Sequence, residues 1–220
     1  MKSKKAILLM WTLALAPVIL VLFCLSTLPQ RIPMHWGIDG TIRYGGKWEL
    51  VGLTLLSPLL AFLYQFLPRI DPRKHNYSKF QRHYDRLAPL ISLFFLLMVS
   101  LTLLESYCPG SVTVYKAVGV LVGSLFLVIG NLMGKIKSNF FMGIRSPWSL
   151  EDPDIWNKTQ RLGGKCFFLS GLIAVAGALL LSEKIYAAVF FLSAIPCVLL
   201  PCFMSWRWYR CKKTQDRPSS

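Results

Sequence analysis

Six long blocks of apolar residues, nearly free of charge, alternate with shorter polar segments along the chain. A helix needs about 20 apolar residues to cross the hydrocarbon core of a bilayer, and each block has close to this length. The pattern predicts an all-α integral membrane protein with six transmembrane helices, folded as a single membrane domain over residues 1–220. We expect these helices at residues 6–28, 50–67, 87–107, 112–134, 166–182 and 185–205.

The distribution of lysine and arginine around these blocks predicts how the chain is oriented. Most of the 25 Lys and Arg residues lie before the first block, in the second and fourth connections, and after the last block. Cytoplasmic segments of membrane proteins carry this kind of excess. We therefore expect both termini in the cytoplasm, an extracytoplasmic loop at 29–49 and a cytoplasmic loop at 130–164. The first block is too long for the apolar part of a signal peptide, so we expect it to remain as a span.

Charge and cysteine content narrow the function further. The net charge is +15, which in a soluble protein would suggest nucleic acid, but here the cations flank spans and face anionic lipid. We expect membrane lipid as a partner and no direct contact with nucleic acid. The six cysteines form no CxxC pattern, and the loops offer no set of three or four metal ligands. We therefore predict no metal site and no cofactor.

The extracytoplasmic loop carries candidate binding residues of its own. Its sequence, LPQRIPMHWGIDGTIRYGGKWEL, suggests a short hairpin with its turn at Gly45 and Gly46. Two interpretations stay open. The aromatic rings fit the interfacial belt of a membrane protein, or the loop is a recognition surface where stacking and charge hold a peptide or a lipid headgroup. The recognition residues would be His35, Trp36, Asp39 and Lys47.

The cytoplasmic loop is chemically richer than most connections. Its segment NFFMGIRSPWSLEDPDIWNKTQR (residues 139–161) combines tryptophan, arginine, asparagine and acidic side chains. Ser146 precedes a proline, so we expect an extended backbone there. Asp152 followed by Pro153 predicts the start of a helix. We expect this helix to be short, ending at Leu162 because a Gly–Gly pair follows.

Arg145 is the most distinctive side chain of this segment, because a guanidinium offers a rigid fork for a carboxylate or a phosphate. Two roles stay open: an ion pair with Glu151, Asp152 or Asp154 that stabilises the loop, or a clamp for an anion or a peptide. We expect both tryptophans of the segment at the inner membrane surface. The candidate binding residues are Asn131, Lys135, Asn139, Arg145, Trp148, Trp156, Thr159 and Arg161.

Small residues recur at helical spacing in the fourth and fifth blocks, for example at Gly119, Gly123 and Gly130. Such spacing allows close helix packing, and a kink or cavity for a ligand stays open as the alternative. Ionisable side chains are essentially absent from the interior of the blocks. This argues against a proton-coupled transporter and against an intramembrane protease.

The motifs of both loops resemble those of the SdpI family, bacterial polytopic membrane proteins named for immunity to a secreted toxic peptide. The cytoplasmic loop matches the family pattern at Gly130, Asn131, Met133, Lys135, Lys137, Asn139, Gly143, Ile144, Arg145, Pro147, Trp148, Leu150, Trp156, Lys158, Thr159, Arg161 and Gly164. The outer loop matches the family's N-terminal domain at Leu28, Pro29, Ile32, Pro33, His35, Trp36, Gly40 and Lys47. The chain departs from the family pattern at Ser146, Ser149, Gln160, Gly37 and Arg43.

The resemblance implies a bacterial cell-membrane protein that protects against a membrane-active antimicrobial peptide such as a bacteriocin. As a further hypothesis, it implies signalling to a cytoplasmic regulator. The outer loop would sense or block the secreted toxic peptide, and a platform around Arg145 and Trp148 would act inside. The alternative is an integral membrane enzyme acting on a lipid or a peptide. We do not favour an enzyme, because the loops offer no nucleophile–base pair.

Overall fold

The computed structural model describes residues 3–37 and 41–215 of the chain. Within these ranges, six continuous stretches are helical, long and apolar enough to cross a membrane, so the predicted number of spans is confirmed. The helices are α1 (Lys4–Cys24), α2 (Lys47–Thr54), α3 (Leu56–Ile70), α4 (Tyr77–Tyr107), α5 (Val114–Met133), α6 (Pro147–Glu151), α7 (Pro153–Leu180), α8 (Glu183–Ala194) and α9 (Pro196–Gln215), with a 3-10 turn η1 (Lys74–Asn76) before α4.

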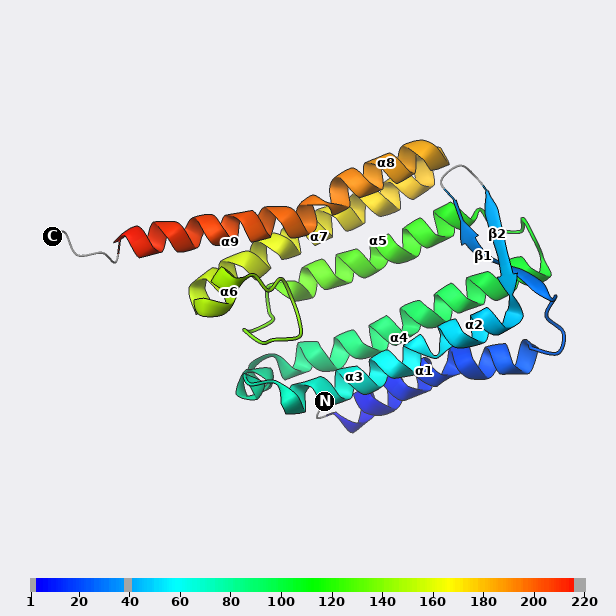
Figure 1. Ribbon diagram of the computed structural model, residues 1–220, viewed down its shortest axis with the longest axis horizontal. Helices are drawn as coiled ribbons and strands as arrows, with labels where there is room; N and C mark the ends of the chain where they lie inside the picture. Colours follow the sequence, from blue (N-terminus) through cyan, green and yellow to red (C-terminus); the bar gives the residue numbers. More distant parts are fainter. Residues whose placement is uncertain (1–2, 38–40, 216–220) are drawn as a thin grey trace.

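Two of the six spans are built from pairs of helices. α2 and α3 meet at Leu55, and α8 and α9 meet at Ile195, and both joining residues keep a helical backbone. Each pair therefore continues across the molecule in nearly one direction (Figure 1). Pro196 opens α9 and explains the second break, because proline has no N–H to donate to the preceding turn.

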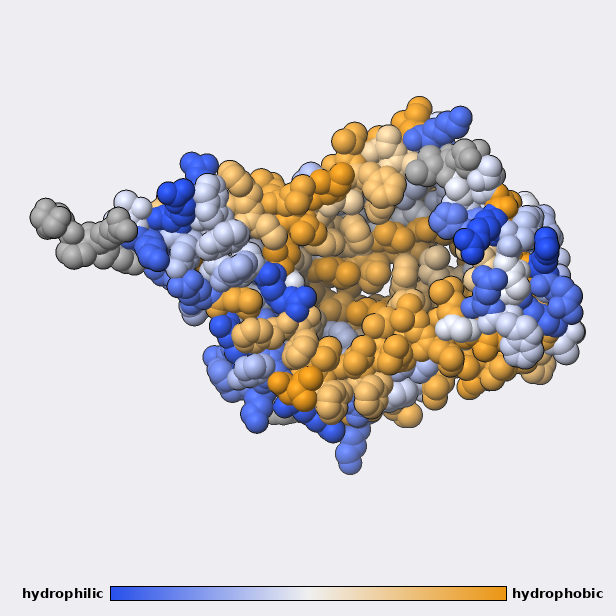
Figure 2. All heavy atoms as spheres, in the orientation of Figure 1, coloured by the Kyte–Doolittle hydropathy of each residue, from blue (hydrophilic) through white to orange (hydrophobic). Residues whose placement is uncertain are grey.

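The spans fall into two groups of three. α1, the α2–α3 pair and α4 pack together, and α5, α7 and the α8–α9 pair form the second group, with α4 and α5 in contact between them (Figure 1). α1 begins and α9 ends at one end of the bundle, here called the loop end, because α6 also lies there. Hydrophilic residues gather at this end and at the opposite one, with a broad apolar band between (Figure 2). This distribution is the one a multi-pass membrane protein requires.

A small antiparallel sheet at the opposite end, the hairpin end, is the one departure from the predicted all-α fold among the described residues. Strand β1 (Arg31–Trp36) pairs with β2 (Ile42–Gly46), and Arg31 faces Gly46. The expected hairpin exists, but the expected turn at Gly45 and Gly46 is wrong. Gly45 is a buried strand residue whose added Cβ would lie 2.7 Å from the Met34 side chain, and Gly46 is the N-cap of α2. These glycines permit close packing and a helix start rather than a reversal.

Glycines bring α5 and α7 into backbone contact. A Cβ added at Gly130 would lie 2.5 Å from the Phe168 nitrogen and 2.7 Å from the Gly164 carbonyl oxygen. Closer to the opposite end of the bundle, a Cβ on Gly171 would lie 2.7 Å from the carbonyl oxygen of Gly123. Since small residues let two helices approach this closely, the packing interpretation of the glycine spacing applies at these positions.

Replacing Gly130 by alanine should destabilise the protein, because the new methyl group meets backbone atoms of α7 that cannot move independently. Overpacking of this kind costs about 1–3 kcal/mol. Gly52→Ala is the matched control, since nothing lies within 4 Å of its added Cβ. An exposed helical glycine of this kind should gain roughly 0.5–1 kcal/mol on the same change. Thermal unfolding in detergent micelles measures both, and equal unfolding temperatures would contradict the packing argument.

The same packing explains why the predicted short helix is wrong. α7 begins as expected, with the Asp152 side chain accepting hydrogen bonds from the backbone nitrogens of Asp154 (2.7 Å) and Ile155 (3.2 Å). It does not end at Gly163 and Gly164 but continues to Leu180. A Cβ on Gly163 would meet the side chains of Ile144 and Met133, and a Cβ on Gly164 would meet the Gly130 carbonyl oxygen. The small size of the two glycines therefore serves packing rather than helix termination.

Candidate functional site

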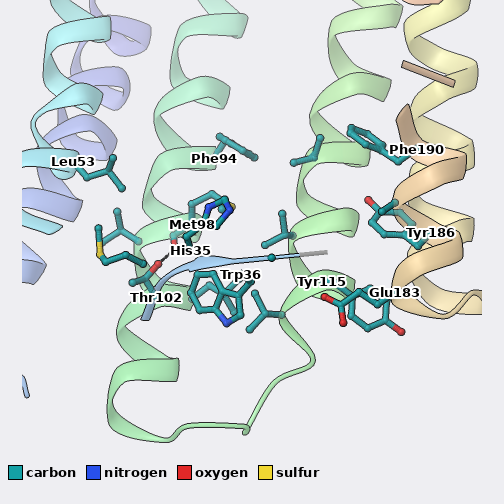
Figure 3. Close-up of a pocket in the computed structure, with 18 of the residues that line it drawn as sticks. His35, Trp36, Leu53, Phe94, Met98, Thr102, Tyr115, Glu183, Tyr186 and Phe190 are labelled. Carbon is teal, nitrogen blue, oxygen red and sulfur yellow. Dashed lines mark hydrogen bonds between the residues drawn. The ribbon is translucent and has the colours of Figure 1, made fainter. Parts of the chain in front are cut away.

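An apolar cavity of about 520 Å³ lies at the hairpin end, between α4, α5 and α8. Strand β1 crosses its opening, and aromatic side chains from α4 and α8 form much of its wall (Figure 3). A cavity of this size and character suits an apolar ligand or an apolar part of a larger one. Its wall includes Trp36, Phe94, Met98, Val118, Tyr186 and Phe190.

A second hollow of about 440 Å³ adjoins the cavity on the hairpin side. The two share Trp36, Tyr115 and Glu183, so together they form one recess that opens at the hairpin end. Glu183 is half-buried at the start of α8 and makes no hydrogen bond or ion pair within the described part of the chain. Glu105 also borders the second hollow, but its carboxylate accepts from the backbone nitrogens of Gly110 and Val112 (both 3.0 Å).

The apolar recess extends from the cavity along the gap between α4 and α5. A smaller hollow of about 110 Å³ shares Phe94 with the cavity and is lined by leucines of both helices, including Leu97 and Leu121. Figure 2 shows this apolar depression between the two groups of helices. A ligand in the cavity would therefore be in contact with the apolar band of the protein as well as with the hairpin.

The predicted residues of the outer loop have different environments. His35 and Trp36 line the cavity, as the recognition interpretation requires. Lys47 does not line the cavity, and its ammonium donates to the Leu25 carbonyl oxygen at 2.9 Å. Asp39 lies outside the described residues. The belt interpretation fits Trp48, which is 67% exposed on the surface of the hairpin end.

The signature segment (residues 130–164) folds at the loop end around Asn139, which is fully buried. Its side-chain nitrogen donates to the Lys137 carbonyl oxygen at 2.8 Å, and its oxygen accepts from the backbone nitrogens of Phe141 (2.9 Å) and Met142 (2.6 Å). Asn139 thus replaces the backbone partners that a helix or strand would supply. These hydrogen bonds fix the shape of the loop.

Residues of the second connection form hydrogen bonds with this loop, although the sequence did not single them out. The buried carboxylate of Asp71 accepts from the Tyr77 hydroxyl and from the Phe140 backbone nitrogen, both at 2.9 Å. Arg73 donates to the Ser138 hydroxyl and to the Leu150 carbonyl oxygen, and its guanidinium lies over the Phe140 ring. The second and fourth connections therefore form one hydrogen-bonded layer.

Two side chains of α7 also form hydrogen bonds with the main chain of this layer. Trp156 is 1% exposed, and its indole nitrogen donates to the Ile136 carbonyl oxygen at 2.9 Å. Gln160 pairs with the main chain of Ile144 on both sides, accepting from its nitrogen at 3.0 Å and donating to its oxygen at 2.7 Å. Gly143 has a positive φ of 90° and comes so close to this amide that a Cβ there would lie 2.5 Å from its oxygen. Glycine is required at that position on both counts.

Arg145 forms none of the ion pairs that were expected within the signature segment. It is exposed, and its guanidinium donates to the Phe140 carbonyl oxygen. The carboxylates instead hold α9: the Tyr209 hydroxyl donates to Glu151 at 2.6 Å, and Lys212 contacts Asp152 at 2.5 Å. The ion-pair interpretation was wrong because it considered only acids close in sequence, whereas α9 supplies closer partners.

The remaining predicted residues separate into buried and exposed groups. Thr159 is fully buried, and its hydroxyl donates to the Ile155 carbonyl oxygen at 2.8 Å. Trp148 is half-buried, whereas Trp156 lies in the interior rather than at the expected surface. The exposed predicted residues are Asn131, Lys135, Arg145 and Arg161. This second group offers the most surface to a partner.

The contact between α9 and the signature segment should weaken in acid. The Lys212 ammonium beside Asp152 holds the pKa of that carboxyl below its ordinary value of about 3.9. A carboxyl with a lowered pKa stabilises the folded state above its ordinary pKa and loses that contribution as the pH falls through the lowered value. A spin label on the exposed Cys211, with the other cysteines replaced by serine, should become more mobile below pH ~4.

Asp152→Asn is the control for this titration, because asparagine keeps the helix N-cap and removes the charge. The label in this variant should be mobile at neutral pH already and should change little in acid. A label equally immobile at pH 7 and pH 3 in the unmodified protein would show that the ion pair does not hold α9.

Two family models match segments of this chain that contribute to the candidate site. Residues 135–205 match the model of the SdpI/YfhL protein family. Residues 12–57 match a second model, described as a domain of unknown function (DUF1648). The resemblance to the SdpI family and to its N-terminal domain is therefore confirmed.

A curated relative aligns with most of the chain. It is "Immunity protein SdpI" of Bacillus subtilis (strain 168), 22% identical over 183 residues, which is 83% of this chain and 86% of that protein. No solved structure matches the chain. The SdpI/YfhL match includes α6, α7, α8 and much of the signature segment, and the DUF1648 match includes the hairpin, so each contributes to the wall of the cavity.

Proposed function

We propose that this protein is a bacterial membrane immunity protein that protects the cell by holding part of a membrane-active antimicrobial peptide in the cavity at the hairpin end. The observation that carries the proposal is the apolar cavity of about 520 Å³, opening beneath β1 and continuing toward the apolar band. Membrane-active peptides carry apolar side chains that leave water for the bilayer. A preformed apolar cavity beside the membrane competes for those side chains.

The charge distribution supports an orientation in which this cavity faces outward. The loop end carries the start of α1, the end of α9 and most of the Lys and Arg residues, which favours the cytoplasmic side for this end. The hairpin end would then lie outside the cell, where a secreted peptide arrives. The name of the relative, an immunity protein, agrees with this arrangement.

Signalling to a cytoplasmic regulator is the second part of the proposal. The exposed cations of the signature segment, Lys135, Arg145 and Arg161, offer a surface for an acidic region of such a regulator. The buried members of the segment keep this surface in place. Protection and signalling would then use opposite ends of the molecule, so that variants can separate them.

Survival of a sensitive Gram-positive host tests the proposal. Cells that express the chain at a measured membrane level are challenged with a panel of membrane-active peptides, with empty-vector cells as the reference. The unmodified protein should raise survival, and Arg145→Ala should keep protection because the cavity is untouched. Peptide recovered from the culture should be intact by mass spectrometry. Cleaved or modified peptide would favour the enzyme alternative, and no protection against any peptide would reject the proposal.

A further inference from the structure

The loop end of the first helix group contains two adjoining hollows that differ from the cavity in chemistry. The first, of about 650 Å³, is bordered by Arg69, Lys74 and His75. The second, of about 690 Å³, is bordered by Arg82 and Arg86. Ser78 and Gln81 border both, so the two form one continuous site. We call this site the basic pocket.

The cations of the basic pocket are not neutralised by the protein. Within residues 3–37 and 41–215, no ion pair and no side-chain hydrogen bond is formed by Arg69, Lys74, Arg82 or Arg86. One carboxylate, that of Asp85, borders the pocket, but its oxygens accept from the Ser3 backbone nitrogen (3.1 Å) and the Gln81 side-chain nitrogen (2.7 Å). Four positively charged side chains therefore border the pocket together with one carboxylate, whose oxygens already accept hydrogen bonds within the protein.

A neighbouring carboxylate, that of Asp71, is also committed elsewhere. Its oxygens accept from the Arg73 backbone nitrogen at 2.7 Å and from the Tyr77 and Phe140 groups described above. Cations dispersed over a surface orient a membrane protein without binding any single molecule. Here two cations border each of two adjoining hollows, and cations gathered in this way can bind an anion through charge-assisted hydrogen bonds.

An amide donor points to the same ligand. The indole nitrogen of Trp11 can only donate, and it donates to the side-chain oxygen of Gln65 at 2.8 Å. This fixes the orientation of the amide, so its nitrogen is left for another acceptor. Gln65 borders the basic pocket. An oxygen-rich anion would supply that acceptor.

Apolar side chains on one side of the basic pocket identify the anion as part of a lipid. Ile7 and Pro68 form part of its wall. Leu8, Phe66 and Ile70 are exposed apolar residues one or two positions away from them on α1 and α3. A soluble phosphate would use the cations alone, whereas a phospholipid would use both surfaces.

We propose that the basic pocket binds the headgroup phosphate of an anionic phospholipid, with its acyl chains along α1 and α3. Binding would fasten α1, η1 and the start of α4 to one another at the membrane surface. The site lies at the opposite end from the cavity, so this inference stands or falls independently of the proposed function.

Native mass spectrometry of the purified full chain tests this proposal. The probes are phosphatidylglycerol, phosphatidylcholine with the same acyl chains, and inorganic phosphate. Phosphatidylglycerol should bind more tightly than phosphatidylcholine. Removing one cation near a charged surface lowers affinity roughly fivefold, so Arg69→Gln with Lys74→Gln should weaken phosphatidylglycerol binding about 25-fold. Phosphatidylcholine binding should change far less.

The matched control is Arg43→Gln with Lys184→Gln, which removes the same charge from exposed residues at the hairpin end. It should leave phosphatidylglycerol binding unchanged. Equal binding of the two lipids, or an equal loss in both double variants, would overturn the proposal. Displacement of the lipid by millimolar phosphate would overturn its assignment to a lipid. Arg69→Lys with unchanged binding, and unfolding temperatures measured in phosphatidylcholine, separate lost charge from lost folding.

Discussion

An Ala187→Phe variant should lose protection against a peptide that the unmodified protein resists. Ala187 lies on α8 in the wall of the cavity, so a benzyl group there occupies the space proposed for the peptide. Ala187 is half-buried and faces an open volume, which means that the added ring fills space without displacing backbone. We expect survival close to that of empty-vector cells. The readout is survival over a peptide dilution series at equal membrane abundance.

Ala188→Phe is the control for this experiment. Ala188 is the next residue of the same helix, is exposed, and does not line the cavity. The two variants add the same side chain to the same element and differ in the direction it faces. Loss of protection in both variants would indicate damage to α8, and retention in both would show that the cavity does not hold the peptide.

Trp156→Ala should be the most destabilising single change at the loop end. The indole is 1% exposed and packs with Tyr77, Phe80 and Tyr84, all buried aromatic residues of α4. Truncating a buried tryptophan to alanine costs about 3–5 kcal/mol. The change also leaves the Ile136 carbonyl oxygen without its donor, which adds to the loss. Denaturant unfolding in micelles measures the effect.

Trp148→Ala provides the comparison, since both tryptophans were expected at the membrane surface. Trp148 is half-buried and its indole makes no hydrogen bond in the described ranges, so its loss should cost about 1 kcal/mol or less. Similar losses in the two variants would mean that the loop-end layer does not depend on Trp156 more than on any other aromatic residue.

The spans were predictable because a bilayer imposes its thickness on the sequence as unbroken apolar blocks. The start of α7 was predictable for a local reason: Asp152 accepts hydrogen bonds from the first turn that follows it. The extended backbone at Ser146, before a proline, is observed as expected. Each of these features depends on residues within a few positions of one another.

The errors arose where distant residues override local signals. Gly163 and Gly164 suggested a helix end, but they stay helical in close contact with Ile144 and with α5. The expected partners of Arg145 are taken by Tyr209 and Lys212, more than fifty positions away. The cavity itself has no sequence signal, because it is the space left between three helices and a hairpin. His35 and Trp36 were recognised by residue type alone.

The hydrogen bonds of Asp71 have a consequence for the order in which the protein is assembled. Its backbone donor at Phe140 is 69 residues further along the chain. At a synthesis rate of about 5–20 residues per second, the donor follows the acceptor by roughly 3 to 14 seconds. Until then the Asp71 carboxylate has only its two nearby donors, the Arg73 backbone nitrogen and the Tyr77 hydroxyl. The third donor arrives with the fourth connection, so the hydrogen-bonded layer at the loop end is completed only after the first three spans have been synthesised.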